Sequence, residues 1–355
     1  MRKLSVTASS VLILLASLLC TPLPADGPTL PALPLPLSNN AVAVLRPGKT
    51  PQLFSLMGIG AGKTWKDITN QAFELSFGSD KWTEIHPVPG TVGRLAAAAV
   101  GLREQVVLFG GYVVDGQGSE GTVPDVNIYR PDAKRWYRGA DIPVPIDDAV
   151  IGTFKDRYVY LISGWSNKDA VKDVQVWDAE KDTWHAGTPI AGTPVFGHAG
   201  AIFEDTIIYV DGAYNNPSGR NPRYVASDEC WMGKIDHHDP TKIEWTKIPN
   251  HPGTARYRIA AGVSAHERKI YFFGGTDNPY NYNGIGYDAR PSEPSPMMFA
   301  WDVRAGKWET VNENTPGATM DNRGLLATPA GLVAIGGMDK GQQVTGRVTV
   351  VPRGH

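Results

Sequence analysis

The stretch Val106-Val107-Leu108-Phe109-Gly110-Gly111 carries the pattern that decides the fold, an apolar run closed by a glycine pair. The pattern recurs at 270–275 and 332–337, and in degenerate form at 53–58, 159–164 and 207–212. Successive copies stand roughly 50 to 60 residues apart, which is typical of repeat proteins in which each unit is one small sheet.

Each of the first five copies is followed by a further strand, aromatic in the clearest cases, and then by a tryptophan. The tryptophans in this register are Trp82, Trp136, Trp184, Trp245 and Trp308. A glycine pair lets backbones approach closely where inner strands crowd an axis, and an outer tryptophan fills the wedge between diverging sheets. Because these residues repeat, we interpret them as architecture and exclude them from any site.

The order of glycine pair, aromatic strand and tryptophan resembles the kelch repeat over nearly the whole chain after its first 25 residues. Six copies predict an all-β, six-bladed kelch-type β-propeller over residues 26–355. The sixth copy ends with a strand at 346–351 and no tryptophan follows it. We therefore expect residues around 29–33, which precede the first inner strand at 41–44, to close the last blade as its outer strand. A proline-rich linker is the alternative for that segment.

The first 25 residues have the order of a secretion signal. Arg2 and Lys3 give a basic start, and residues 11–19 form an apolar stretch shorter than the ~20 residues that span a bilayer. We expect residues 1–25 to be a signal peptide and the protein to be secreted or periplasmic. An uncleaved anchor and a lipid anchor at Cys20 are the alternatives, although Leu19 stands where lipoprotein signals carry a small residue.

Composition argues against several classes of partner. The formal net charge is −2 with both signs interspersed, so no basic stripe is present to bind a nucleic-acid backbone. No later segment is apolar enough to span a membrane, and we expect a monomer. Cys230 is alone in the predicted mature chain and cannot form an intramolecular disulfide. His237 and His238 lie in a predicted turn, where adjacent histidines are usually solvated, so we predict no metal site and no cofactor.

One polar residue stands at the start of each predicted inner strand. These residues are Asn40, Arg94, Asp148, His198, Arg258 and Arg323. Inner-strand starts and the loops after the glycine pairs meet at one mouth of the central channel, where a rigid scaffold commonly carries function. Three arginines against one aspartate would make this mouth cationic and suited to a carboxylate or another anion. Alternatively, the charges pair with one another and only satisfy a polar channel.

The loops beside this ring add further candidates. Tyr214 and Arg220 lie in the fourth-blade loop, Tyr112 and Trp165 follow two other glycines, and the loop 276–283 is rich in asparagine and tyrosine. Flat rings stack on sugars while amides bind hydroxyls, and the same residues are common on protein-recognition surfaces. We predict that the ligand-binding residues are Arg94, Asp148, His198, Tyr214, Arg220, Arg258 and Arg323. The expected partner is a carbohydrate, another anionic small molecule or a surface protein.

Two functions are open for such a site. The first is a non-catalytic recognition module, which needs only the rigid ring and its loops. The second comes from a resemblance: an exported kelch propeller of this length is similar to the bacterial N-acetylneuraminate mutarotases. That resemblance implies an arginine at Arg220, but the family's glutamate is replaced near Ala213. Proton transfer would then fall to Asp148, His198 or Asp211.

A third function, radical copper oxidation as in the galactose oxidases that share this repeat, does not suit the sequence. That chemistry needs a cysteine cross-linked to a tyrosine and two histidine ligands. Cys230 precedes Trp231, and the repeat places no tyrosine beside it.

Overall fold

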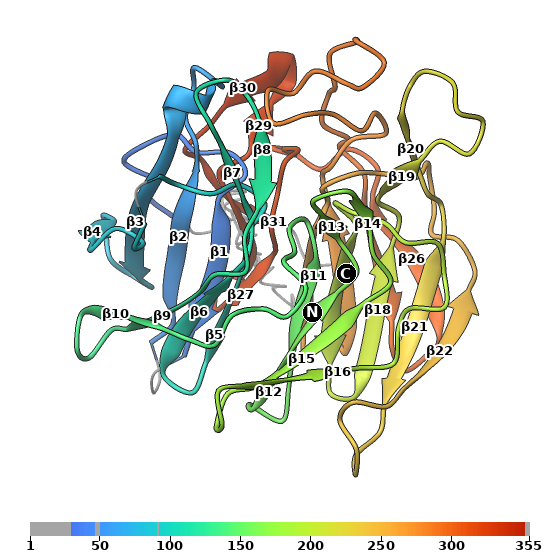
Figure 1. The fold of residues 1–355 in the computed structure, drawn as a ribbon, viewed down its shortest axis with the longest axis horizontal. Helices are drawn as coiled ribbons and strands as arrows, with labels where there is room; N and C mark the ends of the chain where they lie inside the picture. Colours follow the sequence, from blue (N-terminus) through green and yellow to red (C-terminus); the bar gives the residue numbers. More distant parts are fainter. Residues whose placement is uncertain (1–29, 47–49, 91, 352–355) are drawn as a thin grey trace, which may run out of the picture.

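The computed structural model describes residues 30–46, 50–90 and 92–351, so the predicted signal peptide and Cys20 lie outside the described residues. The described chain forms six antiparallel sheets arranged as blades around a central axis (Figure 1). Within each blade the strands follow the chain from the axis outward. The prediction of an all-β, six-bladed propeller is confirmed.

The first three blades each contain four strands. Blade 1 is β1 (Ala41–Leu45), β2 (Gln52–Ile59), β3 (Ile68–Ser76) and β4 (Thr83–Ile85). Blade 2 is β5 (Ala98–Leu102), β6 (Gln105–Phe109), β9 (Val126–Arg130) and β10 (Arg135–Arg138). Blade 3 is β11 (Val150–Phe154), β12 (Tyr158–Ile162), β15 (Val174–Asp178) and β16 (Thr183–Ala186).

The last blade departs from this plan in the described residues. Blade 4 is β17 (Ala199–Phe203), β18 (Thr206–Val210), β21 (Cys230–Ile235) and β22 (Ile243–Ile248). Blade 5 is β23 (Ala260–Ser264), β24 (Lys269–Phe273), β25 (Met298–Asp302) and β26 (Lys307–Asn312). Blade 6 has three strands, β27 (Leu326–Thr328), β28 (Gly331–Ile335) and β31 (Val348–Val351).

Short hairpins extend the loops that follow the glycine positions, several of them in the upper half of Figure 1. They are β7 (Tyr112–Val114) with β8 (Glu120–Thr122), β13 (Trp165–Ser166) with β14 (Asp169–Ala170), β19 (Ala213–Asn215) with β20 (Tyr224–Ala226), and β29 (Met338–Asp339) with β30 (Gln343–Val344). The two 3₁₀ turns are η1 (Trp65–Asp67) and η2 (Lys340–Gln342). No helix among the described residues is long and apolar enough to cross a membrane.

Close approach of backbones explains the glycines that the sequence repeats. A Cβ on Gly110 would stand 2.1 Å from the backbone oxygen of Ile146 in the next blade, and its φ of +56° is left-handed. On the innermost strand of the same blade, a Cβ on Gly101 would stand 2.1 Å from the Val44 oxygen. Side chains larger than hydrogen would therefore push adjacent blades apart at both places.

The outer tryptophans join neighbouring blades through one repeated hydrogen bond. Each indole N–H donates to a backbone carbonyl just after the last strand of the preceding blade. The pairs are Trp136 with His86 (2.7 Å), Trp184 with Ala140 (2.9 Å), Trp245 with Thr188 (3.2 Å) and Trp308 with Pro249 (2.6 Å). This bond satisfies the indole N–H of a half-buried ring that fills the wedge between blades.

The N-terminal segment closes the ring in the same way. Trp82 of blade 1 donates to the Pro31 oxygen at 2.8 Å, so residue 31 takes the place of the missing blade connection. Two residues later Leu33 N donates to Gly346 O at 2.7 Å. The corresponding backbone bonds elsewhere start from Val88, Ile142 and Ile190. Closure by this segment is confirmed, although its prolines leave few donors and residues 30–37 form no regular strand.

Candidate ligand-binding site

One residue of each blade turns into left-handed backbone at the channel mouth, immediately before or near the inner strand. These residues are Asn39, Ala96, Asp148, Gly197, Arg258 and Asp321, with φ between +51° and +65°. Hydrogen bonds pass around the ring from blade to blade, including Asp148 N to Ala96 O (3.0 Å), Gly197 N to Asp148 O (2.9 Å) and Arg258 N to Gly197 O (2.7 Å). This backbone belt holds the mouth rigid and places the side chains that follow.

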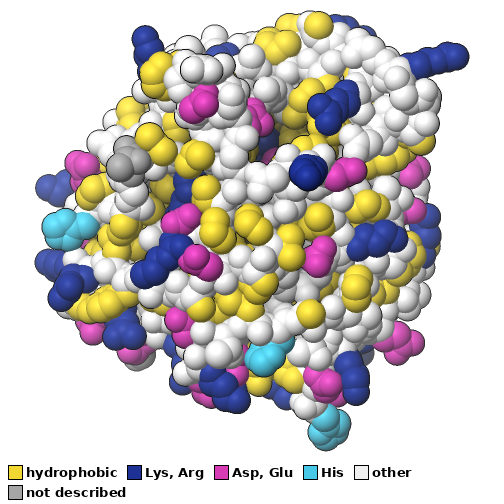
Figure 2. Space-filling model, viewed as in Figure 1, with side chains coloured by type: hydrophobic (Ala, Val, Ile, Leu, Met, Phe, Trp, Pro, Cys, Tyr) yellow, Lys and Arg dark blue, Asp and Glu magenta, His cyan; other side chains and the backbone are white. Residues whose placement is uncertain are grey.

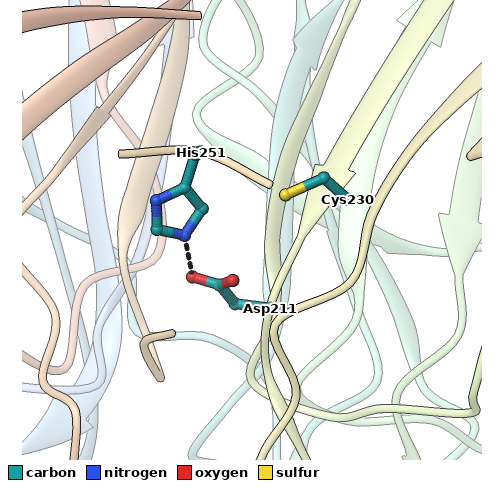
Figure 3. A group of neighbouring side chains, drawn as sticks. All are labelled: Asp211, Cys230 and His251. Atoms are coloured by element: carbon teal, nitrogen blue, oxygen red, sulfur yellow. Dashed lines mark hydrogen bonds and ion pairs between the residues drawn. The ribbon is translucent and has the colours of Figure 1, made fainter. Parts of the chain in front are cut away.

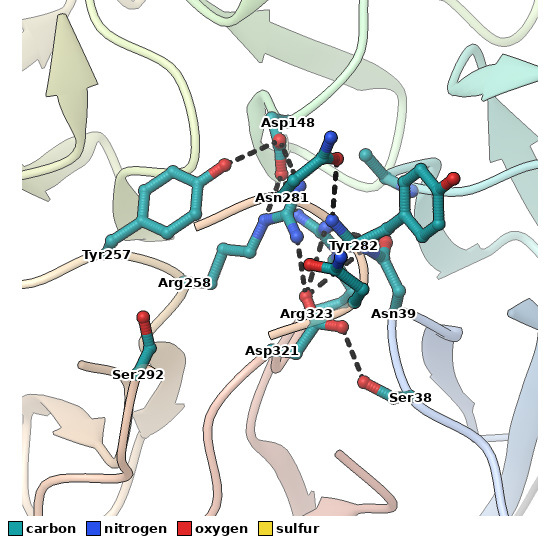
Figure 4. Close-up of polar contacts among 12 residues, drawn as sticks. Ser38, Asn39, Asp148, Tyr257, Arg258, Asn281, Tyr282, Ser292, Asp321 and Arg323 are labelled. Carbon is teal, nitrogen blue, oxygen red and sulfur yellow. Dashed lines mark hydrogen bonds and ion pairs between the residues drawn. The ribbon is translucent and has the colours of Figure 1, made fainter. Parts of the chain in front are cut away.

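Asp148 is the centre of a charge network across the axis (Figure 4). Its Oδ2 lies 2.8 Å from Arg258 Nη2, and its Oδ1 accepts from Arg323 Nη1. Arg258 Nη1 also reaches Asp321 Oδ1 at 2.9 Å. Arg323 additionally donates to Asn39 Oδ1 at 2.6 Å. These side chains come from blades 1, 3, 5 and 6, so only ring closure brings them together.

Pairing sets the ionisation of this network. Burial opposes charge on Asp148, but Arg258 and Arg323 outweigh it and hold the pKa of this carboxyl well below its usual range. The side chains of Asp148, Arg258 and Asp321 are each 3% exposed or less. Arg258 and Arg323 are therefore engaged by protein carboxylates, and the geometry is that of the internally paired alternative.

The remaining predicted residues lie in several places. Arg94 is buried and donates to Asn127 Oδ1 at 2.6 Å within its own blade, turned away from the Asp148 network. Tyr214 lies half-buried in β19, and Arg220 is exposed in the loop after it. The exposed His237 Nε2 lies 3.0 Å from Asp205 Oδ2 in the turn between β21 and β22.

His198 lines the central channel of the propeller, which forms a cavity of its own. This space of about 240 Å³ is lined mainly by small and apolar residues of the six inner strands, with Arg323 at its edge. Neither ring nitrogen of His198 makes a hydrogen bond of good geometry. Burial lowers the pKa of His198 to about 4, opposed in part by the backbone of Ile162 and by Asp148. The ring is therefore neutral at physiological pH.

Above the Asp148 network lies a cavity of about 210 Å³, which we call the mouth cavity. Its aromatic lining residues are Tyr112, Trp165, Phe196, Tyr224, Tyr257 and Tyr287. Its polar lining residues include Glu120, Asp147, Asn167, Arg223 and Asn281. Hairpins β7–β8, β13–β14 and β19–β20 supply about half of its lining residues, and Asn281 and Tyr287 come from the loop after Gly275, so the loops after the glycine positions do surround the mouth.

The aromatic wall is interlocked. Trp165 contacts Phe196 and Tyr224 edge-on, with ring centroids 5.3 and 5.6 Å apart. Tyr224 meets Tyr287 at 4.7 Å, and Phe196 meets Tyr257 at 5.7 Å. Rings held edge to face on one another have little freedom left to lose, so the aromatic wall is rigid.

Two carboxyl groups in the mouth cavity have raised affinity for a proton. Burial, with the neighbouring Asp148 carboxylate, raises the pKa of Asp147 well above its usual range, and Thr122 Oγ1 donates to its Oδ2 at 2.7 Å. Glu120 is exposed at the cavity edge, and partial desolvation by the surrounding residues raises the pKa of its carboxyl against the opposing effect of Arg258. Arg223, by contrast, is exposed, lies over the Tyr224 ring at 5.0 Å and forms no ion pair with any described residue.

Tyr112, Trp165 and the loop with Asn281 were recognised from the sequence, whereas Glu120, Asp147 and Arg223 were not. Asp147 could have been predicted as a mouth residue, since it directly precedes the ring residue Asp148. Glu120 and Arg223 lie at the second strands of hairpins whose lengths vary between blades, so the repeat gives them no fixed position.

A family model described as the KLHDC2/KLHL20/DRC7 Kelch-repeats domain matches residues 52–275. The chain belongs to the kelch-repeat family. This kelch-repeat chain is similar to Kelch-like protein 34 of Homo sapiens, at 24% identity over 243 residues, covering 67% of this chain and 32% of the relative. It is also similar to Kelch-like protein terF of Aspergillus terreus, at 26% identity over 216 residues, covering 58% and 46%.

A third curated relative is Kelch-like protein 15 of Danio rerio, 24% identical over 171 residues, which cover 47% of this chain and 27% of the relative. The chain spans less than half the length of these curated relatives. Among solved structures, "Structure of YjhT" superimposes with a TM-score of 0.70 at 17% identity, covering 91% of this kelch-repeat chain and 99% of the other. At this identity the likeness shows the fold.

Proposed function

We propose that this kelch propeller is an exported recognition protein that binds a carbohydrate, with an anionic group on the ligand, in the mouth cavity. The observation that carries the proposal is the pairing of an interlocked aromatic wall with polar groups that converge on one cavity. Drug-sized ligands occupy pockets of roughly 300–1,000 Å³. A cavity of about 210 Å³ suits a smaller ligand, on the scale of one sugar ring.

In this proposal Arg223 binds the anionic group of the ligand. The arginines deeper in the mouth are already bound to Asp148 and Asp321, so their donors are used within the protein. Arg223 has free donors at the cavity edge and is held against the Tyr224 ring. A guanidinium in this position can bind a carboxylate through two parallel hydrogen bonds while a sugar ring stacks on the aromatic wall.

Binding can be tested with N-acetylneuraminic acid and a neutral monosaccharide of similar size, measured by calorimetry and by quenching of tryptophan fluorescence. Arg223→Gln should weaken binding of the acid by about 10- to 100-fold, the range expected for a lost charged hydrogen bond of ~1.5–3 kcal/mol. Arg220→Gln removes the same charge from the same loop outside the cavity and serves as the matched control. Equal affinities for wild type and Arg223→Gln would eliminate the anion assignment.

A second candidate is anomer exchange of a sugar acid, favoured by the two carboxyl groups of raised pKa. Asp147, whose pKa is raised, could donate a proton to a ring oxygen, and Glu120, which lines the same cavity, could accept one from the anomeric hydroxyl. Proton NMR of freshly dissolved N-acetylneuraminic acid tests this. Faster exchange that is lost in Asp147→Asn supports isomerisation, whereas binding without acceleration at micromolar protein leaves recognition as the function.

The proposed location outside the cytoplasm rests on the N-terminal sequence. Fractionation of cells that express the full chain, with N-terminal sequencing of the mature protein, tests it. A mature protein that begins near residue 26 supports a cleaved signal, and one that starts at a lipid-modified Cys20 supports the anchored alternative.

A further inference from the structure

Three side chains outside the mouth cavity converge between blades 4 and 5: Asp211, Cys230 and His251 (Figure 3). One ligand atom from each lies within 4.8 Å of the others, and all three residues are buried. Asp211 follows β18, Cys230 opens β21, and His251 lies in the connector after β22. The cluster thus joins two strands of one blade to the segment that leads into the next.

The six blades allow an internal comparison of these three positions. At the left-handed residue after the second strand, where blade 4 has Asp211, the other blades carry Met57, Gly110, Ser163, Gly274 and Gly336. At the start of the third strand, paired in the same register as Cys230, they carry Ala72, Val126, Val174, Met298 and Val348. In the connector after the last strand, where His251 stands, they carry Leu33, Val88, Ile142, Ile190 and Thr315, whose backbone N–H groups make equivalent hydrogen bonds.

Blade 4 therefore departs from the repeat at three core positions at once, and at each it has a metal-ligating residue type. A carboxylate and an imidazole in a core are costly unless each is satisfied. Three departures from the repeat whose side chains meet at one point indicate that the three residues act together.

The geometry of His251 prepares it to bind a metal. Its Nδ1 lies 2.8 Å from the Pro252 oxygen, which can only accept, so Nδ1 carries the hydrogen. With the hydrogen on Nδ1, Nε2 of a neutral ring has a lone pair that points toward Asp211 Oδ2, 2.7 Å away. Nε2 and Oδ2 are then both acceptors, so a proton or a metal ion must lie between them. Metal-binding histidines are commonly oriented by this kind of bond from the other ring nitrogen to a backbone carbonyl.

Asp211 and Cys230 have unused capacity to coordinate. Asp211 Oδ1 is buried and has no hydrogen-bond partner, which is costly for a carboxylate oxygen in a core. The Cys230 sulfur has one marginal contact, 4.0 Å from the Asp228 oxygen. The aromatic ring of Phe299 stacks on His251 at 4.0 Å and closes the cluster from one side.

We propose that Asp211, Cys230 and His251 form a structural zinc site that ties blade 4 to the connector entering blade 5. Sulfur, nitrogen and oxygen donors together suit Zn²⁺, and a thiolate with a carboxylate balances its two charges. Zinc bonds of ~2.0–2.3 Å place tetrahedral ligand atoms roughly 3.2–3.7 Å apart, so shifts of about 1 Å complete the site. Asp211 Oδ1 is available for a further coordination position. The bound ion would also order the segment from His251 to Arg258 that reaches the mouth.

The test uses the full chain with Cys20→Ser, so that one thiol remains. We expect about one zinc per chain by elemental analysis after purification without chelator. Zinc at about 100 times its Kd should raise the Tm of the chelator-treated protein by about 4 °C in a chain of this size. Co²⁺ in place of zinc should give a thiolate-to-cobalt charge-transfer band.

Matched variants come from the other blades. His251→Val and Cys230→Val restore the residue types of the repeat, so they should fold, lose the zinc-dependent rise in Tm and lose the cobalt band. His237→Ala with His238→Ala removes the exposed histidine pair and should leave both signals intact. The proposal is overturned by sub-stoichiometric zinc with no change in Tm, by a cobalt spectrum without the thiolate band, or by signals that persist in His251→Val. If the core variants fail to fold, the thiolate band of the Cys20→Ser chain decides alone.

Discussion

Asp148→Asn is the most informative single change for the ring, because it removes the negative charge shared by two arginines from different blades. The side chain keeps its shape and some of its hydrogen bonds, so the change acts mainly on charge. Asp148 is 3% exposed, and its partners Arg258 and Arg323 are 3% and 9% exposed. Both cations remain buried after the substitution, and among the described residues Asp321 is the one carboxylate that still forms an ion pair with them.

Removing one partner of a buried ion pair costs about 3–5 kcal/mol, since the remaining charge stays desolvated. In a chain of this size each kcal/mol corresponds to roughly 1.5 °C in Tm, so we expect a loss of about 5–7 °C. The assay is thermal and urea unfolding at neutral pH. Adding Arg323→Gln to Asp148→Asn should recover part of the loss, because it removes one of the two uncompensated charges.

An exposed pair provides the comparison. Arg268 and Glu204 lie 3.0 Å apart on the surface with side chains 47% and 57% exposed, so Glu204→Gln should cost less than about 1 kcal/mol. A loss of similar size from Asp148→Asn and Glu204→Gln would refute the conclusion that the mouth is held together by a desolvated charge network.

Two further predictions concern stability. The folded-state pKa of His198 is about 4 against an ordinary value of about 6.5, so its stabilising effect is complete above pH 6.5 and is lost as pH falls toward 4. His198→Ala places the residue that other blades have as Ala97 and Ala149. The variant should lose up to about 3 kcal/mol less unfolding free energy than wild type between pH 6.5 and 4. An unchanged pH profile of unfolding would contradict the lowered pKa. Deleting residues 26–36 removes Leu33 and the Trp82 hydrogen bond to Pro31, so the Tm should fall by at least about 5 °C, and an unaltered Tm would disprove closure by this segment.

The repeated features of the chain were sufficient to predict the fold. Gly110 and its counterparts mark the places where neighbouring backbones nearly touch, and the outer tryptophans mark the wedges between blades. Both constraints recur at a regular spacing, so they are visible in one sequence without relatives. The sequence also predicted that the N-terminal segment closes the ring, because the sixth copy has no outer strand of its own.

The candidate site could be predicted from the sequence only in part. Arg258, Asp148 and Arg323 were recognised as mouth residues, but whether they were open to a ligand depended on distances across the axis. Arg94 lies two residues before Ala96, the blade-2 counterpart of Asp148 and Arg258, and it donates to Asn127 in its own blade. The local sequence does not show which residue before each inner strand takes the left-handed conformation that places its side chain in the ring.

By itself, then, the sequence determined the six blades, their order and the segment that closes them, because each depends on residues that repeat along the chain. Tertiary structure alone decided that Asp148 neutralises Arg258 and Arg323, that Arg223 stays free at the mouth cavity, and that Asp211, Cys230 and His251 meet. These contacts join residues that are not neighbours in sequence. They arise only when the ring closes and brings different blades and strands face to face.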